Sequence, residues 1–230
     1  TLVPPAITIG LYFVIFGNLV GRRIGEMGGF QYMEFIVPGL IMMAVIQNSY
    51  SNVVSSFFSH KFQRSVEELL VSPIPNYVIL LGFVVGGMAR GLAVGAIVTT
   101  MSLFFADLSI QSFPITIAVV LMTSVVFSLA GFINAVFADS FDDISIIPTF
   151  VLTPLIYLGG VFYSIQMLPP FWQVVSSLNP IFYMVNTFRY GILGSSDIDV
   201  YWAFMIMGVF ILVLYISCIW LLRHGTGIRN

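Results

Sequence analysis

The sequence has 230 residues, of which 59% are hydrophobic and only 8% are charged, whereas about 25% of the residues in a soluble domain carry charge. With a mean hydropathy of +1.03, the chain has more apolar surface than a soluble fold of this size can bury, so we expect lipid to be its solvent. Its formal net charge of -2 argues against a nucleic-acid-binding surface, which would be strongly basic.

Six segments are long and apolar enough to cross a hydrocarbon core of about 30 Å, which takes roughly 20 helical residues. A β-barrel is excluded because these segments lack alternation between apolar and polar residues. We therefore predict an all-α membrane protein, with residues 1–230 forming a single transmembrane domain from which an N-terminal amphipathic segment is missing. The predicted helices are residues 2–20, 35–58, 76–106, 113–138, 144–163 and 200–222.

The second segment carries an unbroken polar run in its middle, Gln47–Asn52. Polar side chains in lipid need partners, so we expect this run to face protein or a cavity, in contact with either the substrate or a second copy of the chain. Aromatic and aliphatic residues of the fifth segment are candidates for pathway lining, although core packing is the commoner role for each. The candidates from both segments are Gln47, Asn48, Asn52, Phe150, Leu158 and Phe162.

The third segment contains a single charge, Arg90. Because arginine in lipid costs several kcal/mol, from about 3 to above 10, we expect Arg90 to lie near the inner interface and reach water. The alternative is that Arg90 faces protein. Glycines surround it at spacings that let helices approach closely, which is a packing signal. These glycines are Gly82, Gly86, Gly87, Gly91 and Gly95.

Residues 59–75 form a connection that holds four charges and an apolar stripe at helical spacing. Ser65 and Glu68 match a capping box, and Pro73 ends the helical pattern. We predict a short amphipathic helix on the membrane surface, and the alternative is a plain extension of the second segment. The stripe consists of Phe62, Val66, Leu69 and Leu70.

Residues 164–199 contain two short apolar stretches, which begin after Pro169-Pro170 and after Pro180. Proline suits the first helical turn, where its missing N–H has no helical partner to lose. Each stretch has about 8–13 residues and is too short to span the membrane. We predict a re-entrant or interfacial helix pair between passes five and six, at a mouth or gate, and the alternative is a surface cap that only packs.

The chain lacks the residues that common active sites require. Its one lysine, Lys61, follows His60, so the Gly-Lys-Ser/Thr of a phosphate-binding loop is absent. Two histidines and the single Cys218 cannot form a structural zinc site. No acidic residue lies at the centre of an apolar segment, which argues against coupling to an ion gradient. We predict no catalytic residue, no metal and no cofactor in this chain.

Two sets of motifs resemble a known family. Residues 67–75 are E-E-L-L-V-S-P-I-P, and residues 159–170 are G-G-V-F-Y-S-I-Q-M-L-P-P, followed by S-L-N-P-I-F-Y and by Phe188-Arg189-Tyr190. Together they resemble the type 2 permease family of ATP-binding-cassette (ABC) exporters over essentially the whole chain. The chain looks most like the uncharacterised permease branch of the bacterial inner membrane.

The resemblance implies a dimer with a second copy of the chain and two ABC-type ATP-binding subunits, which would hold the ATP and Mg. The 59–72 helix would be the coupling helix that meets the ATPase, through Phe62, Arg64, Glu67 and Glu68. The second and fifth passes would line the pathway, and the pair at 165–190 would form the outer gate. The gate candidates are Pro169, Pro170, Asn179, Pro180, Tyr183 and Arg189.

We therefore predict a transport subunit that exports a drug, lipid or glycan-like substrate across the bacterial inner membrane and is not itself an enzyme. The basic residues indicate orientation only weakly, but the tail favours a cytoplasmic C-terminus, and six passes then place both termini in the cytoplasm. The alternative is an ATP-independent secondary transporter or channel. A membrane-embedded enzyme acting on lipid would need a nucleophile, a metal or an acid–base pair, and none is evident.

Overall fold

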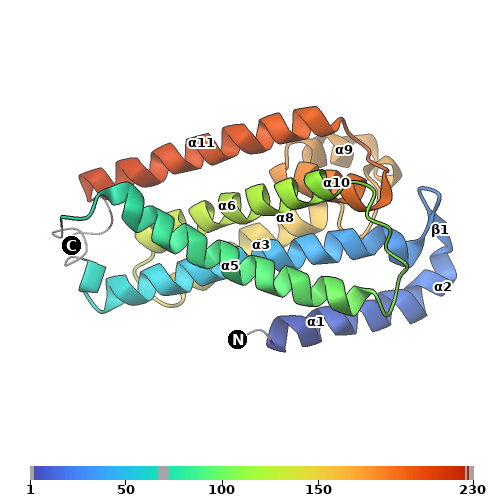
Figure 1. Cartoon of the computed structure of the whole chain (residues 1–230), viewed down its shortest axis with the longest axis horizontal. Coiled ribbons are helices and arrows are strands. Elements are labelled where there is room, and N and C mark those ends of the chain that lie inside the picture. The colour runs from blue at the N-terminus through green and yellow to red at the C-terminus, as the bar shows by residue number, and fades with distance from the viewer. Residues whose placement is uncertain (1–2, 67–72, 226, 228–230) are drawn as a thin grey trace.

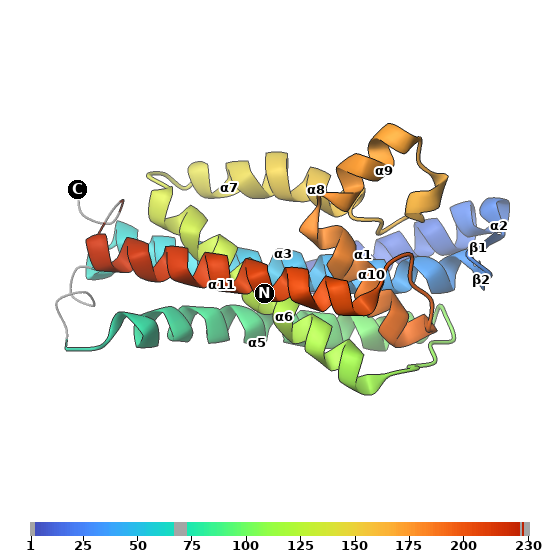
Figure 2. The same cartoon turned by 90° about the horizontal axis from the view of Figure 1, so that it is seen from above.

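The computed structural model describes residues 3–66, 73–225 and 227. It is an elongated bundle whose long helices run roughly along one axis (Figures 1 and 2). The longest helices are α3 (Tyr32–Phe62), α5 (Asn76–Ser102), α6 (Phe113–Phe137) and α11 (Val200–His224).

Shorter elements lie before α3 and between α6 and α11. The chain begins with α1 (Val3–Val14), which continues through the π-helical turn η1 (Ile15–Val20) into α2 (Gly21–Ile24). A small antiparallel hairpin follows, with Glu26 opposite Gln31 and Met27 opposite Phe30. The remaining elements are β1 (Glu26–Met27), β2 (Phe30–Gln31), α7 (Asp143–Ile147), η2 (Pro148–Leu152), α8 (Thr153–Leu158), η3 (Ile165–Met167), α9 (Pro170–Ser177) and α10 (Pro180–Leu193).

The helix α3 lies at the centre and packs most extensively against α5 and α6. Every residue from Phe35 to Ile46 is buried, as expected for a helix that is apolar all round. Glycines permit the close approach. A Cβ on Gly95 would lie 2.8 Å from Cγ2 of Val45, and a Cβ on Gly131 of α6 would lie 2.7 Å from the carbonyl oxygen of Tyr50. Glycines on both neighbours therefore bring their backbones against α3.

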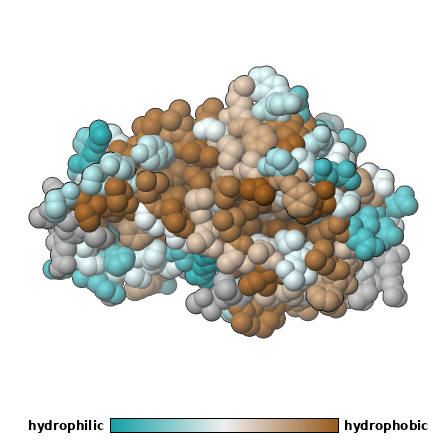
Figure 3. Space-filling view, in the orientation of Figure 1, coloured by the Kyte–Doolittle hydropathy of each residue, from teal (hydrophilic) through white to brown (hydrophobic). Residues whose placement is uncertain are grey.

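The surface of the bundle is apolar over most of its length. Figure 3 shows hydrophobic side chains over much of one face, with hydrophilic ones gathered mainly toward the two ends. On α11, the exposed residues include Trp202, Val213 and Trp220. A soluble protein rarely exposes so large an apolar area, and a bundle whose helices satisfy their own backbone hydrogen bonds suits a lipid environment.

Within the residues that the structure describes, α5, α6 and α11 are each long and apolar enough to cross a membrane. The 31-residue helix α3 is longer but contains the polar run, and Val3–Gly17 and Asp143–Leu158 form shorter apolar helices. The prediction of an all-α membrane protein is confirmed, and the number of six passes stays a prediction. The fifth helix ends earlier than predicted because Gly160 adopts a φ of +75° and turns the chain.

The predicted surface helix at 59–72 lies only partly within the described residues. Ser59–Phe62 form the last turn of α3, so the predicted start at residue 59 was too early. The chain then turns at Arg64, whose φ is +60°, and Ser65 is helical again. The Ser65 hydroxyl donates to the His60 carbonyl oxygen at 3.1 Å. Residues 67–72, including Glu67 and Glu68, lie outside the described residues.

Substitution of Gly91 tests the close packing of α3 and α5. A Cβ on Gly91 would collide with the Ser49 side chain, whereas a Cβ on Gly82 would meet no atom within 4 Å. We expect Gly91→Val to lower the free energy of unfolding by about 1–3 kcal/mol through overpacking. Thermal unfolding of the purified protein in detergent measures the effect, with Gly82→Val as the matched control. Equal shifts for both variants would contradict this packing.

Candidate functional site

The polar run of α3 is divided between the core and a cavity. Asn48, Ser49 and Tyr50 are buried, Gln47 and Asn52 are half-buried, and Ser51 is exposed. The Asn48 amide donates to the Ala44 carbonyl oxygen at 2.9 Å, so its polar group is satisfied within α3. These placements agree with the expectation that the run faces protein or a cavity. Its contact with a substrate or with a second copy of the chain stays a prediction.

Arg90 lies at the edge of a cavity between α3, α5 and the fifth segment. Its Nη1 donates to Oδ1 of Asn52 at 3.4 Å, and its Nε is buried without a hydrogen-bond partner among the described residues. Arg90 therefore contacts protein through Asn52, as the alternative expects, and its position relative to the membrane interface stays a prediction. The cavity has a volume of about 330 Å³. Its lining residues are Tyr50, Ser51, Val54, Ser55, Arg90, Ile144, Ser145, Pro148 and Thr149.

The three candidates on the fifth segment have different environments. Phe150 is 73% exposed, and Leu158 is half-buried at the end of α8. Phe162 packs inside the protein, where its ring centroid lies 4.9 Å from that of Phe16 and 5.7 Å from that of Tyr157. Phe162 therefore takes the packing role that we considered commoner, and the exposed Phe150 remains available to line a pathway or meet a partner.

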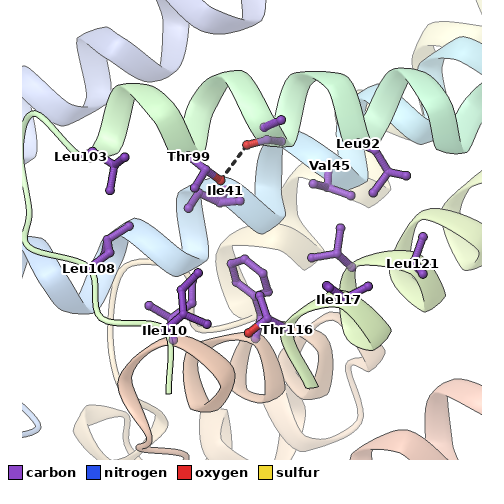
Figure 4. A pocket seen from close by; sticks show the side chains of 15 residues that line it. Ile41, Val45, Leu92, Thr99, Leu103, Leu108, Ile110, Thr116, Ile117 and Leu121 are labelled. Atoms are coloured by element: carbon purple, nitrogen blue, oxygen red, sulfur yellow. Dashed lines mark hydrogen bonds between the residues drawn. The ribbon is translucent and has the colours of Figure 1, made fainter. Parts of the chain in front are cut away.

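A second cavity, of about 420 Å³, lies between α5 and α6 and is almost entirely apolar (Figure 4). Ile41 and Val45 of α3 reach it from one side, and Leu121 of α6 reaches it from another. Thr99 lines it too, but its hydroxyl donates to the Gly95 carbonyl oxygen at 2.8 Å, as the dashed line in Figure 4 shows. The Thr99 hydroxyl is therefore already satisfied within its own helix.

Lys61 fastens the end of α3 to the end of α6. Its Nζ donates to the carbonyl oxygens of Val136 and Ala138 at 2.8 and 2.7 Å and lies 3.6 Å from Oδ1 of Asp139. A cation suits this position because the last carbonyls of a helix lack helical partners and carry partial negative charge. This contact could not be predicted from the sequence, since only the fold brings Lys61 to residues that follow it by more than 70 positions.

The loop between α6 and α7 is held by its own acidic residue, Asp143. The Asp143 Oδ2 accepts hydrogen bonds from the backbone N–H groups of Asp139 and Ser140 at 3.0 and 2.9 Å. The Asp139 bond, followed by the bonds of Ser140, lowers the pKa of the Asp143 carboxyl below its ordinary value. Asp143 therefore stays ionised at neutral pH and fixes the turn that leads from α6 into the fifth segment. Lys61 contacts the beginning of the same turn.

Of the coupling candidates that the structure describes, Phe62 is 65% exposed and Arg64 is exposed. Phe62 contacts Phe141 of the α6–α7 loop, with ring centroids 5.2 Å apart. Both side chains are therefore accessible from the end of the bundle, and their role in coupling is untested.

The helices α9 and α10 begin where their prolines predict. Pro169 is the N-cap residue of α9, and Pro170 is its first residue. Asn179 caps α10: its Oδ1 accepts from the Ile181 N–H at 3.0 Å, and its Nδ2 donates to the Leu155 carbonyl oxygen at 2.6 Å. Pro180 follows as the first residue of α10, so one asparagine both starts α10 and ties it to α8. The Tyr183 hydroxyl donates to the Ser177 carbonyl oxygen at 2.8 Å and joins α10 to α9.

Arg189 is 2% exposed and joins α10 to two other parts of the bundle. Its Nη2 donates to the Gly160 carbonyl oxygen at 2.7 Å, and its Nε donates to the Phe35 carbonyl oxygen at 3.3 Å. The third donor, Nη1, reaches Oδ1 of Asn186 at 3.3 Å, and the guanidinium carbon lies 3.8 Å from the centroid of the Phe35 ring. Each guanidinium nitrogen has a partner, so Arg189 locks α10 to α3 and to the turn after α8.

Among the residues described, no group of three or more His, Cys, Asp or Glu could hold a metal ion. The described parts of the chain thus combine long apolar helices with a polar cavity and a charged contact at one end.

Comparison with known proteins gives the family. The sequence model of the ABC-2 type transporter family matches residues 1–193. The inner membrane transport permease YadH of Escherichia coli (strain K12) is 59% identical over 230 residues, which cover 100% of this chain and 90% of that protein. The nodulation protein J of Neorhizobium galegae is 24% identical over 219 residues, or 93% of this chain and 82% of that protein.

The chain belongs to the ABC-2 type transporter family, which confirms the resemblance seen in its motifs. It is a multi-pass protein of the inner membrane and the membrane subunit of an ABC transporter. Membrane subunits of this family are transport components that generally lack an ATPase site, and membership implies an ATP-binding partner subunit.

Replacement of Arg189 tests its role as a lock. Arg189→Met removes a cation and leaves the Gly160 and Phe35 carbonyl oxygens without this donor, so we expect the free energy of unfolding to fall by about 1–3 kcal/mol or more. Arg223→Met at the exposed end of α11 is the control and should change it by less than about 0.5 kcal/mol. Thermal unfolding in detergent measures both variants. A fully stable Arg189→Met protein would show that the three hydrogen bonds contribute nothing.

Proposed function

We propose that this permease exports a drug, lipid or glycan-like substrate outward across the inner membrane, using ATP hydrolysed by its partner subunits. The observation that carries the proposal is the unbroken α3. This one helix extends from the polar run beside the cavity to Phe62, next to the segment that resembles the coupling helix. A displacement at that end would therefore reach the cavity through a rigid rod.

Lys61 would extend this displacement to a second helix. Because its Nζ holds the carbonyl oxygens of Val136 and Ala138, a push on the end of α3 would also move the end of α6 and the loop to α7. ATP binding would close the partner subunits, and the closely packed helices would rock as rigid units. The fifth segment, which follows Asp143, would then move relative to α3 and open the polar cavity.

We infer that six passes cross the membrane and that both termini of the protein are cytoplasmic. The two views place the C-terminal end of α11, the start of α5 and the ends of α3 and α6 at one end of the bundle (Figures 1 and 2). We assign this end to the cytoplasm because residues 59–66 and 73–75, which flank the segment that resembles the coupling helix, lie there. The helices α9 and α10 lie toward the opposite end and would form the outer gate, with Arg189 fixing α10.

The permease would act as a dimer of two copies. Ser51 and Ser55 are exposed on α3, beside the cavity, and small polar residues are enriched where membrane helices pack against one another. A second copy would cover this face and enclose a pathway between α3 and the fifth segment, where Phe150 is 73% exposed. The alternative, an ATP-independent transporter or channel, leaves the need for the charged end of α3 unexplained.

Copurification tests the proposal. A tagged, full-length permease expressed with its neighbouring genes should copurify with an ABC-type ATP-binding subunit, and the complex in proteoliposomes should hydrolyse ATP. The permease alone should show no ATP hydrolysis. Proteoliposomes that contain only the permease should not take up ³²P-labelled dodecyl phosphate when a proton gradient is imposed. Gradient-driven uptake without any ATP-binding subunit would overturn the proposal in favour of a secondary transporter.

Charge reversal tests the coupling segment. Glu67→Lys combined with Glu68→Lys should weaken the complex with the ATP-binding subunit by roughly tenfold or more. The two lysines would repel the basic groups of the partner that the two glutamates are proposed to attract. Asp107→Lys, in the connection after α5, is the control and should leave the complex intact. Copurification yield and ATP hydrolysis by the assembled complex are the measurements. Unchanged assembly, ATP hydrolysis and transport in the double variant would exclude these glutamates from the contact.

A further inference from the structure

Arg90 lies in the middle of α5 rather than near either end. It is the fourteenth residue after Asn76 in a helix of 27 residues, or about 21 Å along the helix at 1.5 Å per residue. The hydrocarbon core is about 30 Å thick. An arginine at this depth costs several kcal/mol unless it has partners, and an ionisable residue inside a membrane marks a functional site by default.

Among the residues that the structure describes, no carboxylate forms an ion pair with Arg90. In the described ranges, the recorded ion pair is that of Lys61 and Asp139, at the end of the bundle. Arg90 has only the neutral Asn52 side chain as a hydrogen-bond partner, at 3.4 Å. Arg189 provides the internal contrast, since each of its guanidinium nitrogens bonds to protein. Every guanidinium nitrogen of Arg189 therefore has a protein partner, whereas the Arg90 Nε has none among the described residues.

The cavity beside Arg90 offers hydrogen-bond donors and no carboxylate. Its nine lining residues include Tyr50, Ser145 and Thr149 but neither aspartate nor glutamate. The buried Tyr50 hydroxyl makes no hydrogen bond within the described structure; Asn134 lies close by, but no bond of acceptable geometry joins the two. Two residues before Ser145 lies Asp143, whose Oδ2 accepts two backbone N–H groups of its own loop.

A second copy of the chain would not supply the missing negative charge. None of the ten acidic residues in the sequence lies inside the six apolar segments, so those segments of a partner would carry no carboxylate to offer. An anion that arrives with the substrate would complete the site. Guanidinium binds phosphate, sulfate and carboxylate through paired charge-assisted hydrogen bonds.

We propose that Arg90 recognises an anionic group on the transported molecule, held between its guanidinium and the polar side chains of α3 at Tyr50 and Asn52. The inference rests on the proposed function, because it takes the cavity as part of the transport pathway. It narrows the substrate to a class: an amphiphile with a phosphate, sulfate or carboxylate group. Its apolar part would lie against the residues that surround the cavity, such as Val54 and Ile144.

Equilibrium binding to the full-length permease tests this inference without the ATP-binding subunit. The permease is reconstituted in phosphatidylcholine nanodiscs, and binding of ³²P-labelled dodecyl phosphate is measured against empty nanodiscs. Unlabelled dodecyl phosphate should compete, whereas dodecyltrimethylammonium and dodecyl maltoside should not. Competition by inorganic phosphate would support the anion site and assign recognition to the anion alone. Equal competition by the cationic or neutral amphiphile would overturn the inference.

Three variants show whether Arg90 is responsible. Arg90→Gln should weaken binding roughly tenfold to a hundredfold, because it removes a charge-assisted contact, and Arg90→Lys should retain part of the affinity. Asn52→Asp places a carboxylate beside the guanidinium, so it should weaken binding even if Arg90→Gln fails to fold. Arg223→Gln is the exposed control and should bind normally. Undiminished binding by Asn52→Asp and by a folded Arg90→Gln protein would overturn the inference.

The two proposals fail in different ways. Binding that depends on Arg90, in a permease that copurifies with no ATP-binding subunit, would leave the anion site standing and overturn the ATP-driven mechanism. A complex that hydrolyses ATP but binds dodecyl phosphate no better than dodecyltrimethylammonium would leave the mechanism standing and remove the anionic substrate.

Discussion

The contact of α3 with its two neighbours is the constraint on which the rest of the structure depends. Lipid supplies no hydrophobic drive for one apolar helix to pack on another, so close backbone approach must hold them. Gly91 and Gly95 provide it on α5, and Gly131 provides it on α6. With α3 fixed in this way, its polar run faces the core and one cavity, and its last turn meets α6 through Lys61.

Arg90 and Arg189 show that the same residue type can have two different roles in one bundle. Arg189 is buried over the face of the Phe35 ring, and each of its guanidinium nitrogens has a protein partner. These contacts hold α10 against α3 and the turn after α8. Arg90 has one long hydrogen bond and an open cavity. A buried cation that is fully satisfied stabilises a fold, whereas one left with free donors is suited to bind something that comes and goes.

The sequence predicts the helices well because their signals are local. Prolines 169, 170 and 180 mark the starts of α9 and α10, and hydropathy alone locates α5, α6 and α11. The sequence does not predict contacts between residues that lie far apart in the chain. The side on which Arg90 lies could not be predicted, since Asn52 is 38 positions away. The spacing of the five glycines around Arg90 does not distinguish one from another. In the structure, a Cβ on Gly82 would meet no atom within 4 Å, whereas a Cβ on Gly91 would collide with Ser49.

A transport subunit that works with an ATP-binding partner has to receive work from that partner and direct it to the substrate. Two covalent paths connect the end of the bundle at Lys61 with the cavity, α3 itself and the loop from α6 to α7, and Lys61 joins the two paths. The cavity lies between those same two paths, with Ser51 and Ser55 on α3 and Ser145 and Thr149 on the fifth segment. Any change in the angle between the paths therefore alters the cavity wall opposite Arg90. An anion held there would resist or favour that change according to its fit, and this is how substrate binding and ATP hydrolysis would become coupled.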